Sequence, residues 1–374
     1  MKKSILYVAT SDIHIATFHL PYIKWLSEQG YAVDLAVEIR NPEIQFENVR
    51  KVYNIQFPRA IFNANLYSSY KELKSIIDLG NYKLVHCHTP VPSLLTRLAS
   101  RAARKLGTTV LYTAHGFHFY KGAPFMRWAI YYTAEKWLSK FTDGIITINA
   151  EDFNYVKSWG ACDSYYIKGI GVDSQRFIQV DQIEKNNLRD ELGYNQHDFI
   201  LLYIAEFIDR KNHKFIIEAL PNLVRKIPNL KLLLAGKGVL VDQIKNQVTE
   251  LKLDEFVDFL GFRKDVHRFS LISDIGVSAS KHEGLGLGLA EQMMCGVPIV
   301  ATMDRGHKEM VISGENGYLF EQGNHDEFVK HVLELYQNAE KRNTFSINAI
   351  KSSQQFDIKN SLASMVNIYN KYLD

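Results

Sequence analysis

Two glutamates, Glu283 and Glu291, stand eight positions apart in the stretch SASKHEGLGLGLAEQMMCGVP, residues 278–298. Three alternating glycines lie between them, and an amphipathic run over residues 289–295 predicts a helix. Glycines let a backbone approach a phosphate closely, and a helix start directs free N–H groups and a positive dipole end toward an anion. The pattern is typical of a site for a sugar nucleotide. On glycine spacing alone, a tight strand-to-helix turn with two solvated carboxylates explains it equally well.

A second candidate group of phosphate ligands follows an earlier apolar run. Arg210 and Lys211 come after the predicted strand 199–205, whereas the Gly-rich stretch comes after the predicted strand 275–277. Loops that follow the strands of one parallel sheet can converge at its carboxyl edge. Lysine supplies a compact charge and arginine a planar fork for a diphosphate. The sequence therefore predicts a diphosphate site that both loops share.

In the first half of the chain, polar residues and histidines follow predicted strands. The loop at residues 10–15 offers Ser11, Asp12 and His14, and it lacks the G-x-G-x-x-G pattern of a dinucleotide site. In His86-Cys87-His88, only the two histidines share a strand face, so the sequence favours a packed and a ligand-facing imidazole over a metal site. His115, before a glycine at a strand end, is placed either to face a ligand or to serve as a structural histidine.

Alternating apolar runs and helical patterns position these residues and predict an α/β fold with two doubly wound parallel sheets. We expect an N-terminal domain over residues 1–167 and a C-terminal domain over residues 168–357. A last helix, at about residues 358–374, is expected to pack back on the first domain. The predicted strands span residues 4–9, 32–37, 83–88, 109–113, 144–148, 199–205, 230–235, 257–260, 275–277, 298–301 and 317–320, and the predicted helices span residues 19–29, 92–106, 150–159, 214–226 and 361–373.

Composition excludes several classes of protein. The 374 residues are 46% hydrophobic and 23% charged, which is normal for a folded chain with two domains. The three cysteines lack C-x-x-C spacing, and a reducing cytoplasm fits them. No run approaches the roughly 18 apolar residues that a membrane span needs. The N-terminal apolar run stops after Ala9, so it indicates a strand rather than a signal peptide.

Positive charge is concentrated in the first half of the chain. Residues 1–165 hold 19 lysines and arginines against 13 aspartates and glutamates, whereas the remainder holds 25 against 28. Residues 125–141, FMRWAIYYTAEKWLSKF, combine aromatic and basic side chains, which is typical of a helix at a membrane interface. A packed aromatic core and solvated basic helix faces are the alternative interpretation. An anionic partner such as a lipid surface, a nucleic acid or a diphosphate substrate would fit the charge.

The order of short motifs in the second half resembles glycosyltransferase family 4. They are Val172-Asp173, Arg210-Lys211-Asn212, residues 260–266 (LGFRKDV), the E-x7-E core from Glu283 to Glu291, residues 296–301 (GVPIVA), Gly306…Glu309 and Gly314…Gly317. Three motifs in the first half resemble the branch that builds capsule, exopolysaccharide and lipopolysaccharide repeat units. They are His14-Ile15…Phe18-His19-Leu20-Pro21, His88-Thr89-Pro90 and Thr113-Ala114-His115-Gly116-Phe117-His118.

The resemblance implies a GT-B fold, two Rossmann-like domains facing a cleft, with the acceptor bound by the first domain and the nucleotide sugar by the second. It implies retaining transfer from a nucleotide sugar, usually a UDP-sugar, without a bound metal or other cofactor. Glu283 would bind sugar hydroxyls and Glu291 the ribose, while Lys211 with Arg210 would neutralise the diphosphate. His115 would reach the reacting sugar. The other implied donor residues are Gly284, Leu285, Gly286 and Leu287, through backbone N–H groups, and Phe262 and Arg263, which would hold the base.

Two departures from the family pattern bear on the site. Ala205-Glu206 stands where many members carry Gly-Arg, so a usual phosphate-binding arginine is missing. The glycine-rich first loop is replaced by Ser11-Asp12-Ile13-His14, and with His88 these residues become the expected acceptor side.

The leading hypothesis is a cytoplasmic glycosyltransferase, peripheral on the inner face of the plasma membrane, that acts on a polyprenyl-diphosphate-linked saccharide. A non-hydrolysing UDP-sugar epimerase of the same architecture is the alternative, and acceptor-free turnover would identify it. A nucleic-acid-binding protein is disfavoured because no such motif is present. An NAD-dependent enzyme is disfavoured because neither half has the dinucleotide fingerprint.

Overall fold

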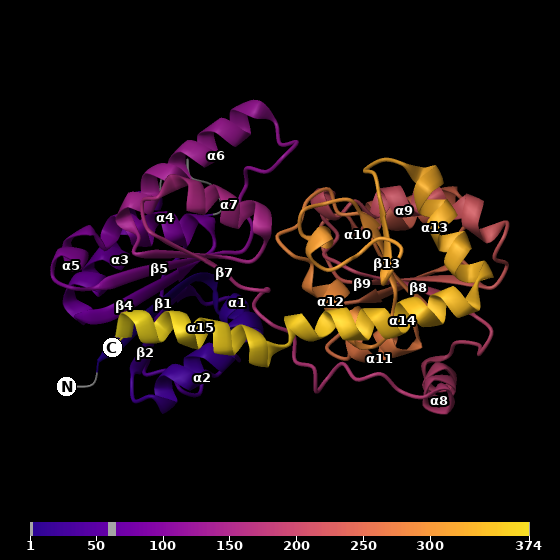
Figure 1. The fold of residues 1–374 in the computed structure, drawn as a ribbon, viewed down its shortest axis with the longest axis horizontal. Helices are drawn as coiled ribbons and strands as arrows, with labels where there is room; N and C mark the ends of the chain where they lie inside the picture. The colour runs from indigo at the N-terminus through magenta and orange to yellow at the C-terminus, as the bar shows by residue number, and fades with distance from the viewer. Residues whose placement is uncertain (1–2, 59–64, 374) are drawn as a thin grey trace. The chain divides into compact units, whose positions relative to one another are not determined.

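The computed structural model describes residues 3–58 and 65–373 and divides the chain into two compact units. Unit 1 comprises Met1–Gly171 with Lys359–Asp374, and unit 2 comprises Val172–Ile358. Each unit contains one parallel sheet with helices on both faces (Figure 1). The predicted α/β class with two doubly wound parallel sheets is confirmed.

The sheet of unit 1 has the strand order β3-β2-β1-β4-β5-β6-β7, and every neighbouring pair is parallel. The chain winds away from β1 in both directions, so the topological switch point lies between β1 and β4. Ligands of such sheets bind outside the carboxyl ends of the strands at the switch point. The strands are β1 (Ser4–Ser11), β2 (Ala32–Glu38), β3 (Lys51–Asn54), β4 (Tyr82–His88), β5 (Thr109–Ala114), β6 (Gly144–Thr147) and β7 (Asp163–Tyr166).

The helices of unit 1 cover both faces of this sheet. Alternate residues of the strands separate the faces, so Leu6 and Val8 pack with α3 and α4, whereas Tyr7 faces α15. The helical segments are α1 (Asp12–Phe18), α2 (Leu20–Glu28), α3 (Leu66–Gly80), α4 (Pro90–Ala99), α5 (Arg101–Lys105), α6 (Phe125–Leu138), η1 (Ser139–Phe141), α7 (Ala150–Trp159) and α15 (Ile358–Leu373).

The loop expected at residues 10–15 is wrong. Strand β1 continues to Ser11, and α1 starts at Asp12. The Ser11 hydroxyl accepts a hydrogen bond from the His14 backbone N–H at 3.3 Å and so caps the helix. The polar residues that suggested a loop are instead an N-cap, Ser11, and an acidic residue of the first turn, Asp12. Both are common at helix starts as well as in loops.

Several other elements differ from the sequence-based expectation, which also lacked strand β7 and the helices over residues 182–192, 241–250, 266–272, 325–337 and 339–353. The helix expected over residues 92–106 starts at Pro90 and is split into α4 and α5. Proline is tolerated in a first helical turn, so Pro90 did not have to precede the helix. Strand β3 and helix α3 were not predicted. Strand β3 is a short edge strand without a buried face, whereas α3 buries Leu73 and Ile77, a 3.6-residue pattern that the sequence does contain.

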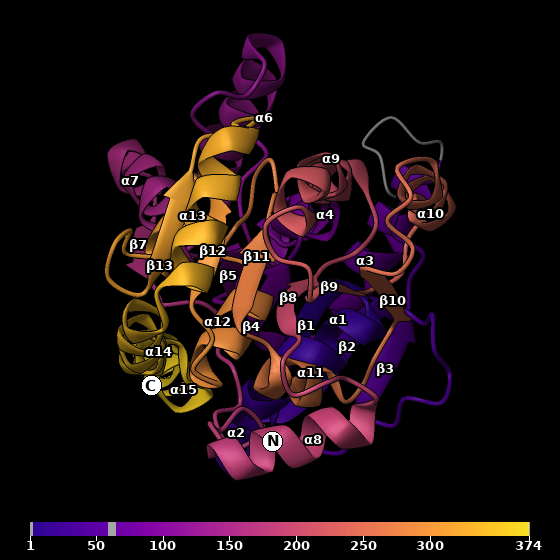
Figure 2. The same ribbon diagram turned by 90° about the vertical axis from the view of Figure 1, so that its right-hand side faces the viewer.

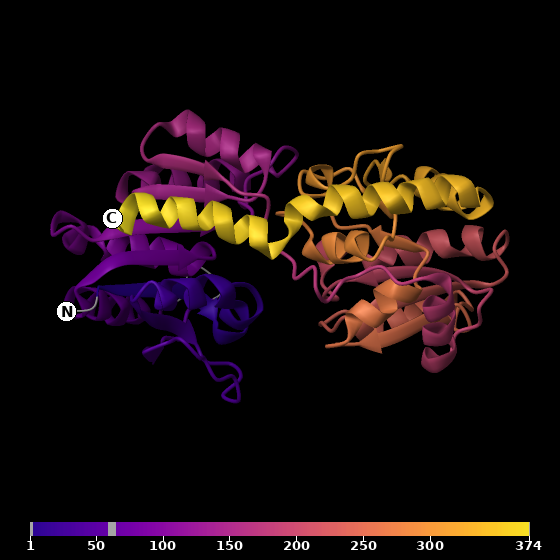
Figure 3. The same ribbon diagram turned by 60° about the horizontal axis from the view of Figure 1, so that its bottom comes forward.

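Helix α15 belongs to unit 1 and lies along its sheet (Figure 3). The Tyr369 hydroxyl hydrogen-bonds the Nδ1 atom of His86 at 2.8 Å, and the ring of Trp25 stacks on the ring of Tyr369. Nearer the end of α15, Lys371 forms an ion pair with Asp163 at 2.7 Å. These contacts tie the last helix to β4, α2 and β7.

The sheet of unit 2 has the strand order β10-β9-β8-β11-β12-β13, again all parallel (Figure 2). Its switch point lies between β8 and β11. The strands are β8 (Phe199–Ile204), β9 (Leu230–Ala235), β10 (Val257–Gly261), β11 (Ile275–Ser278), β12 (Ile299–Thr302) and β13 (Gly317–Phe320). The helical segments are α8 (Gln182–Leu192), η2 (Asp209–Lys211), α9 (His213–Val224), α10 (Val241–Glu250), α11 (Val266–Ile272), α12 (Leu287–Met294), η3 (His307–Glu309), α13 (His325–Gln337), α14 (Ala339–Ser353) and η4 (Gln354–Phe356).

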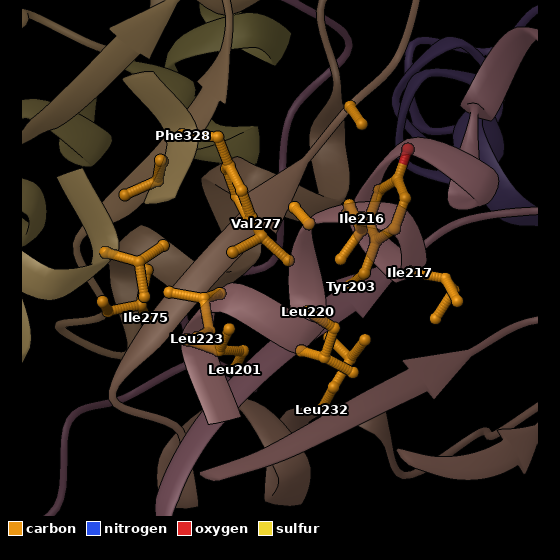
Figure 4. Packing of buried hydrophobic residues seen from close by; sticks show 14 of the residues in the cluster. Leu201, Tyr203, Ile216, Ile217, Leu220, Leu223, Leu232, Ile275, Val277 and Phe328 are labelled. Atoms are coloured by element: carbon orange, nitrogen blue, oxygen red, sulfur yellow. The ribbon is translucent and has the colours of Figure 1, made fainter. Parts of the chain in front are cut away.

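The main core of unit 2 lies between the sheet and helices α9, α10 and α13 (Figure 4). Leu201 and Val277, from the two strands at the switch point, pack there with Leu220 of α9, and all three are fully buried. Each such side chain contributes roughly 1.5–3 kcal/mol of burial free energy. This packing fixes the carboxyl ends of β8 and β11 relative to each other.

Helix α6 carries most of the aromatic segment. Trp128 and Tyr132 stack with ring centroids 4.5 Å apart and pack against the core of unit 1. Phe125, Met126 and Ile130 are exposed, at 81%, 75% and 60%. The segment is therefore partly core and partly an exposed apolar face.

Arg97, one of the basic residues of the first half of the chain, is fully buried. Its guanidinium forms two hydrogen bonds, of 2.7 and 3.1 Å, with the Glu135 carboxylate and so joins α4 to α6. Among the helices of residues 3–58 and 65–373, none is long and apolar enough to cross a membrane.

Candidate active site

Glu283 lies at the switch point of unit 2, on the loop between β11 and α12, and two cations bind its carboxylate. The Arg210 Nη1 atom donates to the Oε2 atom of Glu283 at 2.8 Å, and the Lys211 Nζ atom contacts the Oε1 atom. Arg210 also donates to the His282 carbonyl at 3.0 Å. The predicted convergence of the two loops is therefore observed, and Arg210, Lys211 and Glu283 are called the charged trio below.

The hydroxyl of Tyr203 holds these two loops together. Tyr203 is a buried residue of β8 whose ring packs in the core (Figure 4), while its hydroxyl reaches the carboxyl end of the strand. The hydroxyl donates to the Lys211 carbonyl oxygen at 2.5 Å and lies 3.1 Å from the Ser280 Oγ atom. One core side chain thus positions both halves of the charged trio.

The loop after β12 supports Glu283 from the other side. Asp304 Oδ1 accepts hydrogen bonds from the backbone N–H groups of Glu283 and Gly306, both at 2.9 Å. A side chain at Gly306 would place its Cβ 2.9 Å from the Cα of Leu285, so this position has room only for glycine. His307 is buried, and its Nδ1 atom donates to the Thr302 carbonyl at 2.8 Å. These residues fix the backbone of the Gly-rich stretch.

The electrostatics keep Glu283 ionised. Burial acts to raise the pKa of its carboxyl, but Lys211 and then Arg210 outweigh burial and bring the pKa down to about 2. The trio carries one negative and two positive charges, so it retains a net positive charge for an anionic ligand. A diphosphate that replaced Glu283 as the partner of the two cations would leave the carboxylate available to hydroxyl groups.

Helix α12 begins beside the trio. Gly286 is its N-cap at φ 96°, a left-handed conformation that favours glycine, and the first N–H groups of an α-helix have no partner inside the helix. Glu291 lies in the second turn, and none of the described residues hydrogen-bonds its carboxyl group. Burial raises the pKa of Glu291 to about 7, and Arg176 acts against the rise. The two glutamates therefore have opposite electrostatic environments.

Two predicted donor-site residues and one departure from the family pattern lie outside the trio. Arg263 forms two hydrogen bonds with the Asp265 carboxylate, of 2.7 and 2.6 Å, and lies over the Phe269 ring. Phe262 is 67% exposed beyond β10, at the edge of the sheet. Glu206, which stands where many family members carry a phosphate-binding arginine, is exposed after β8.

The switch point of unit 1 gathers the expected acceptor-side residues at the ends of β1 and β4. Thr10 and Thr89, at these two ends, share a hydrogen bond of 2.7 Å. The Asp12 carboxylate accepts from the backbone N–H groups of Ile13, Arg40 and Asn41 at 2.7, 3.1 and 2.9 Å. Asp12 is 1% exposed, so it orders the adjoining backbone, whereas a ligand contact was expected from its sequence position.

Histidines dominate this switch point. The Nε2 atoms of His14 and His19 are 3.2 Å apart, and the His115 Nε2 atom lies 3.4 Å from the His88 Nδ1 atom. The His88 Nε2 atom is buried and has no hydrogen-bond partner among the described residues. His86, behind them, hydrogen-bonds Tyr369 and Thr113 at 2.8 Å each. The sequence prediction that His86 and His88 share a strand face is confirmed.

Burial keeps these imidazoles neutral. It lowers the pKa of His14 to about 4 and the pKa of His86 to about 3. The pKa values of His19, His88 and His115 fall well below the usual range, first through burial and then through neighbouring histidines. Neutral imidazoles can accept hydrogen bonds, donate them or bind metal ions.

Comparison with known proteins identifies the family. Residues 184–352 match the family described as "Glycosyl transferases group 1", and residues 4–149 match "Glycosyl transferase 4-like". EpsD of Bacillus subtilis (strain 168), named as a glycosyltransferase, is 40% identical over 378 residues, covering 100% of this chain and 98% of that protein. The chain belongs to this glycosyltransferase family. The finding agrees with the sequence resemblance and does not favour the epimerase alternative.

Two further relatives of the glycosyltransferase are informative. The "UDP-Gal:alpha-D-GlcNAc-diphosphoundecaprenol alpha-1,3-galactosyltransferase" of Escherichia coli is 27% identical over 280 residues, covering 72% of this chain and 71% of that protein. The crystal structure of Anabaena Alr3699/HepE in complex with UDP superposes with a TM-score of 0.79 at 21% identity, covering 99% of this chain and 100% of that one. The second similarity shows that the glycosyltransferase has the GT-B fold.

Sequence reasoning missed several residues that build the glycosyltransferase's site. Tyr203, Asp304 and His307 act through buried hydrogen bonds. Their spacing in the sequence does not indicate that role. His19 was assigned only to a helix start and a family motif, although it joins His14 in the structure. A buried polar residue at the end of a predicted strand is the signal that could have identified Tyr203.

Proposed function

We propose that this glycosyltransferase moves a sugar, with retention of the anomeric configuration, from a UDP-sugar to a polyprenyl-diphosphate-linked saccharide. The observation that carries the proposal is the charged trio beside the start of α12, at the switch point of unit 2. UDP or UDP-glucose in the similar HepE structures supports the choice of donor, and the diphosphoundecaprenol-linked substrate in the name of the E. coli relative supports the acceptor.

The proposal assigns a role to each candidate donor-site residue of unit 2. The diphosphate replaces Glu283 as the partner of Lys211 and Arg210, and N–H groups over residues 284–287 contact the sugar or the diphosphate. Glu283 is thereby released to bind hydroxyls of the donor sugar, while Glu291 binds the ribose. Phe262 and Arg263 hold the base, mostly through backbone groups.

The chemical step redistributes charge between the sugar and the diphosphate. The bond from the anomeric carbon to the UDP oxygen breaks, a bond to the acceptor oxygen forms on the same face, and the leaving diphosphate takes the acceptor's proton. Preorganised cations stabilise the negative charge that develops on the diphosphate. We propose that Lys211 and Arg210 supply this charge, so the donor site works without a bound metal or other cofactor.

Unit 1 has the acceptor role in this proposal. Ser11, Asp12, His14 and His88 border the acceptor, with Asp12 acting through the backbone that it orders. His115 contacts the reacting sugar. Buried neutral imidazoles suit hydroxyl groups, because each offers one N–H donor and one acceptor nitrogen.

Membrane association is proposed through helix α6 and the basic residues around it. Phe125, Met126 and Ile130 form an exposed apolar face, and the exposed Lys136 and Lys140 lie on the same segment. Basic and apolar side chains together favour an anionic lipid surface. The enzyme would then act at the cytoplasmic face of the plasma membrane, in the synthesis of a capsular or exopolysaccharide.

A donor and acceptor screen tests the proposal. Purified protein is incubated with a panel of UDP-sugars and polyprenyl-diphosphate-linked saccharides, and the lipid products are analysed by mass spectrometry. We expect one glycosylated lipid, formed without added metal and with an α-linkage when the donor is an α-linked UDP-sugar. Absence of transfer and of UDP binding with every donor would overturn the proposal.

A further inference from the structure

Three histidines of unit 1 are arranged around a common point. One ring nitrogen of each of His14, His19 and His115 lies within 4.8 Å of the other two. A tetrahedral zinc ion with Zn–N bonds of about 2.0–2.1 Å holds its ligand nitrogens about 3.3 Å apart and the imidazole centroids about 5.2 Å apart. The observed centroid distances are 5.1, 4.9 and 5.6 Å, and the Nε2 atoms of His14 and His19 are 3.2 Å apart.

The orientation of the rings agrees with a shared ligand. The planes of the three rings are inclined to one another by 49°, 90° and 72°, so no pair is stacked. Imidazoles that pack only through their faces would lie closer to parallel. All three ligand nitrogens lie within 4.8 Å of one another, compared with about 3.3 Å around a tetrahedral zinc ion.

Hydrogen bonding is incomplete around this cluster. Only one of the two nitrogens in the His14–His19 contact can carry the bonding proton, and His88, 1% exposed, has a buried Nε2 atom without a partner among the described residues. A buried polar atom without a partner costs about 1–3 kcal/mol. Such a cost is usual where the native state binds a ligand.

We propose that unit 1 binds one divalent transition-metal ion of the zinc class through His14, His19 and His115. His88 stands behind His115 and orients its ring. Three histidine ligands leave a fourth tetrahedral position open. The Asp12 carboxylate is committed to backbone N–H groups, so the open position would take water or a substrate oxygen.

The sequence analysis expected no metal, and the reason for the difference is topological. His14 and His19 lie on and just after α1, whereas His115 follows β5, and the sequence shows no ligand spacing among them. The metal is separate from the donor chemistry of unit 2. A loaded site would engage His115, so metal binding and the proposed contact of His115 with the donor sugar belong to different states of the enzyme.

A direct binding experiment tests the metal site. Full-length, tag-free protein is stripped with EDTA, dialysed and titrated with Co²⁺ and then with Zn²⁺. We expect one equivalent of Co²⁺ with the visible absorption of tetrahedral coordination, which Zn²⁺ displaces. The absence of a tetrahedral spectrum in wild-type protein overturns the proposal, whatever the behaviour of the variants.

Two variants localise the ion. His19→Ala removes a proposed metal ligand. It should weaken metal binding by more than roughly 10–100-fold, which is the loss caused by removing a residue that only hydrogen-bonds to a ligand. The matched control His197→Ala changes an exposed histidine of unit 2 and should bind as wild type does. Equal affinities of wild type and a folded His19→Ala overturn the site, with folding checked by circular dichroism. His19→Gln and His14→Gln repeat the test if the alanine variant does not fold. No donor or acceptor is used, so the outcome is independent of the proposed transfer.

Discussion

The two switch points of this glycosyltransferase use opposite electrostatic designs. In unit 2 the residues at the ends of β8 and β11 are ionised and paired, with the Glu283 carboxylate between Arg210 and Lys211. In unit 1 the residues at the ends of β1, β4 and β5 are mostly histidines, which burial keeps neutral. The same parallel-sheet topology thus presents permanent charge in one unit and neutral donors and acceptors in the other.

The difference indicates what each site can stabilise. Paired cations can exchange an internal carboxylate for a diphosphate, because both groups bind through anionic oxygens. Neutral imidazoles gain nothing from a permanent anion unless a proton or a metal ion accompanies it, but they match hydroxyl groups well. We therefore expect changes in unit 2 to alter nucleotide binding and changes in unit 1 to alter transfer alone.

The largest effect is expected from Glu283→Gln. Because the carboxylate would contact the donor sugar and position both cations, transfer should fall by roughly 10²–10³-fold, the range for loss of one preorganised polar group. UDP binding should tighten, since the two cations lose their internal partner. Transfer rates and UDP affinity by calorimetry measure both effects. Glu250→Gln, an exposed change on α10, should leave both unchanged, and weaker UDP binding in Glu283→Gln would contradict the exchange.

The next largest effect is expected from His115→Gln in unit 1. Loss of the imidazole should slow transfer by about 10²-fold, as misplacement of a reacting group does. The affinity for UDP should stay at the wild-type value, because the proposed nucleotide site lies in unit 2. His197→Gln is the control. A loss of UDP affinity in His115→Gln would contradict the separate roles of unit 2 in nucleotide binding and of unit 1 in transfer.

The third prediction concerns pH and the two glutamates of unit 2. The folded-state pKa of Glu283, about 2, lies below its ordinary value, so its stabilisation is complete above about pH 4.5 and is lost as the pH falls toward 2. For a side chain that is 9% exposed, the loss should be of the order of 2–3 kcal/mol. Urea unfolding at pH 3 and pH 6 should show a loss in wild type that exceeds the loss in Glu283→Gln by this amount, because other carboxyls with lowered pKa values, such as Asp274, titrate in both proteins.

Glu291 should behave in the opposite sense. Its folded-state pKa, about 7, is raised, so Glu291 contributes stability at low pH that is lost as the pH rises from about 4.5 to 7, against the opposite change from the buried histidines. Because the carboxyl is partly exposed and water screens it, we expect an effect of the order of 1 kcal/mol. Glu291→Gln should lack this loss, and identical slopes in both variants and wild type would contradict the assigned environments.

The smallest effect is expected from Tyr203→Phe. The variant keeps the ring in the core and removes the hydroxyl that joins Lys211 to Ser280. The free energy of unfolding should fall by about 1 kcal/mol, the typical net value of one hydrogen bond. Transfer should fall by less than tenfold, as measured at saturating donor. A loss as large as that in Glu283→Gln would show that loop positioning, rather than charge, dominates the site.

The sequence predicted the fold class and the convergence of Arg210, Lys211 and Glu283, because loops after parallel strands must meet at one edge. It could not predict the residues that act through buried hydrogen bonds, such as Tyr203 and Asp304, since these contacts join segments far apart in the chain. The helix α1 was missed because Ser11 and Asp12 suit both a loop and an N-cap. The His14–His19–His115 cluster was missed because its members come from different elements and only the folded sheet brings them together.

The most direct test of the central claim compares UDP with uridine as ligands of Lys211→Met. If Lys211 neutralises the diphosphate at the switch point of unit 2, the variant should bind UDP roughly 10–100-fold more weakly, equivalent to about 1.5–3 kcal/mol for a charge-assisted hydrogen bond. Its affinity for uridine, which has no phosphate, should match that of wild type, and Lys226→Met, a change of an exposed lysine, should affect neither ligand. Wild-type affinity for UDP in Lys211→Met, or equal weakening of UDP and uridine, would contradict the account.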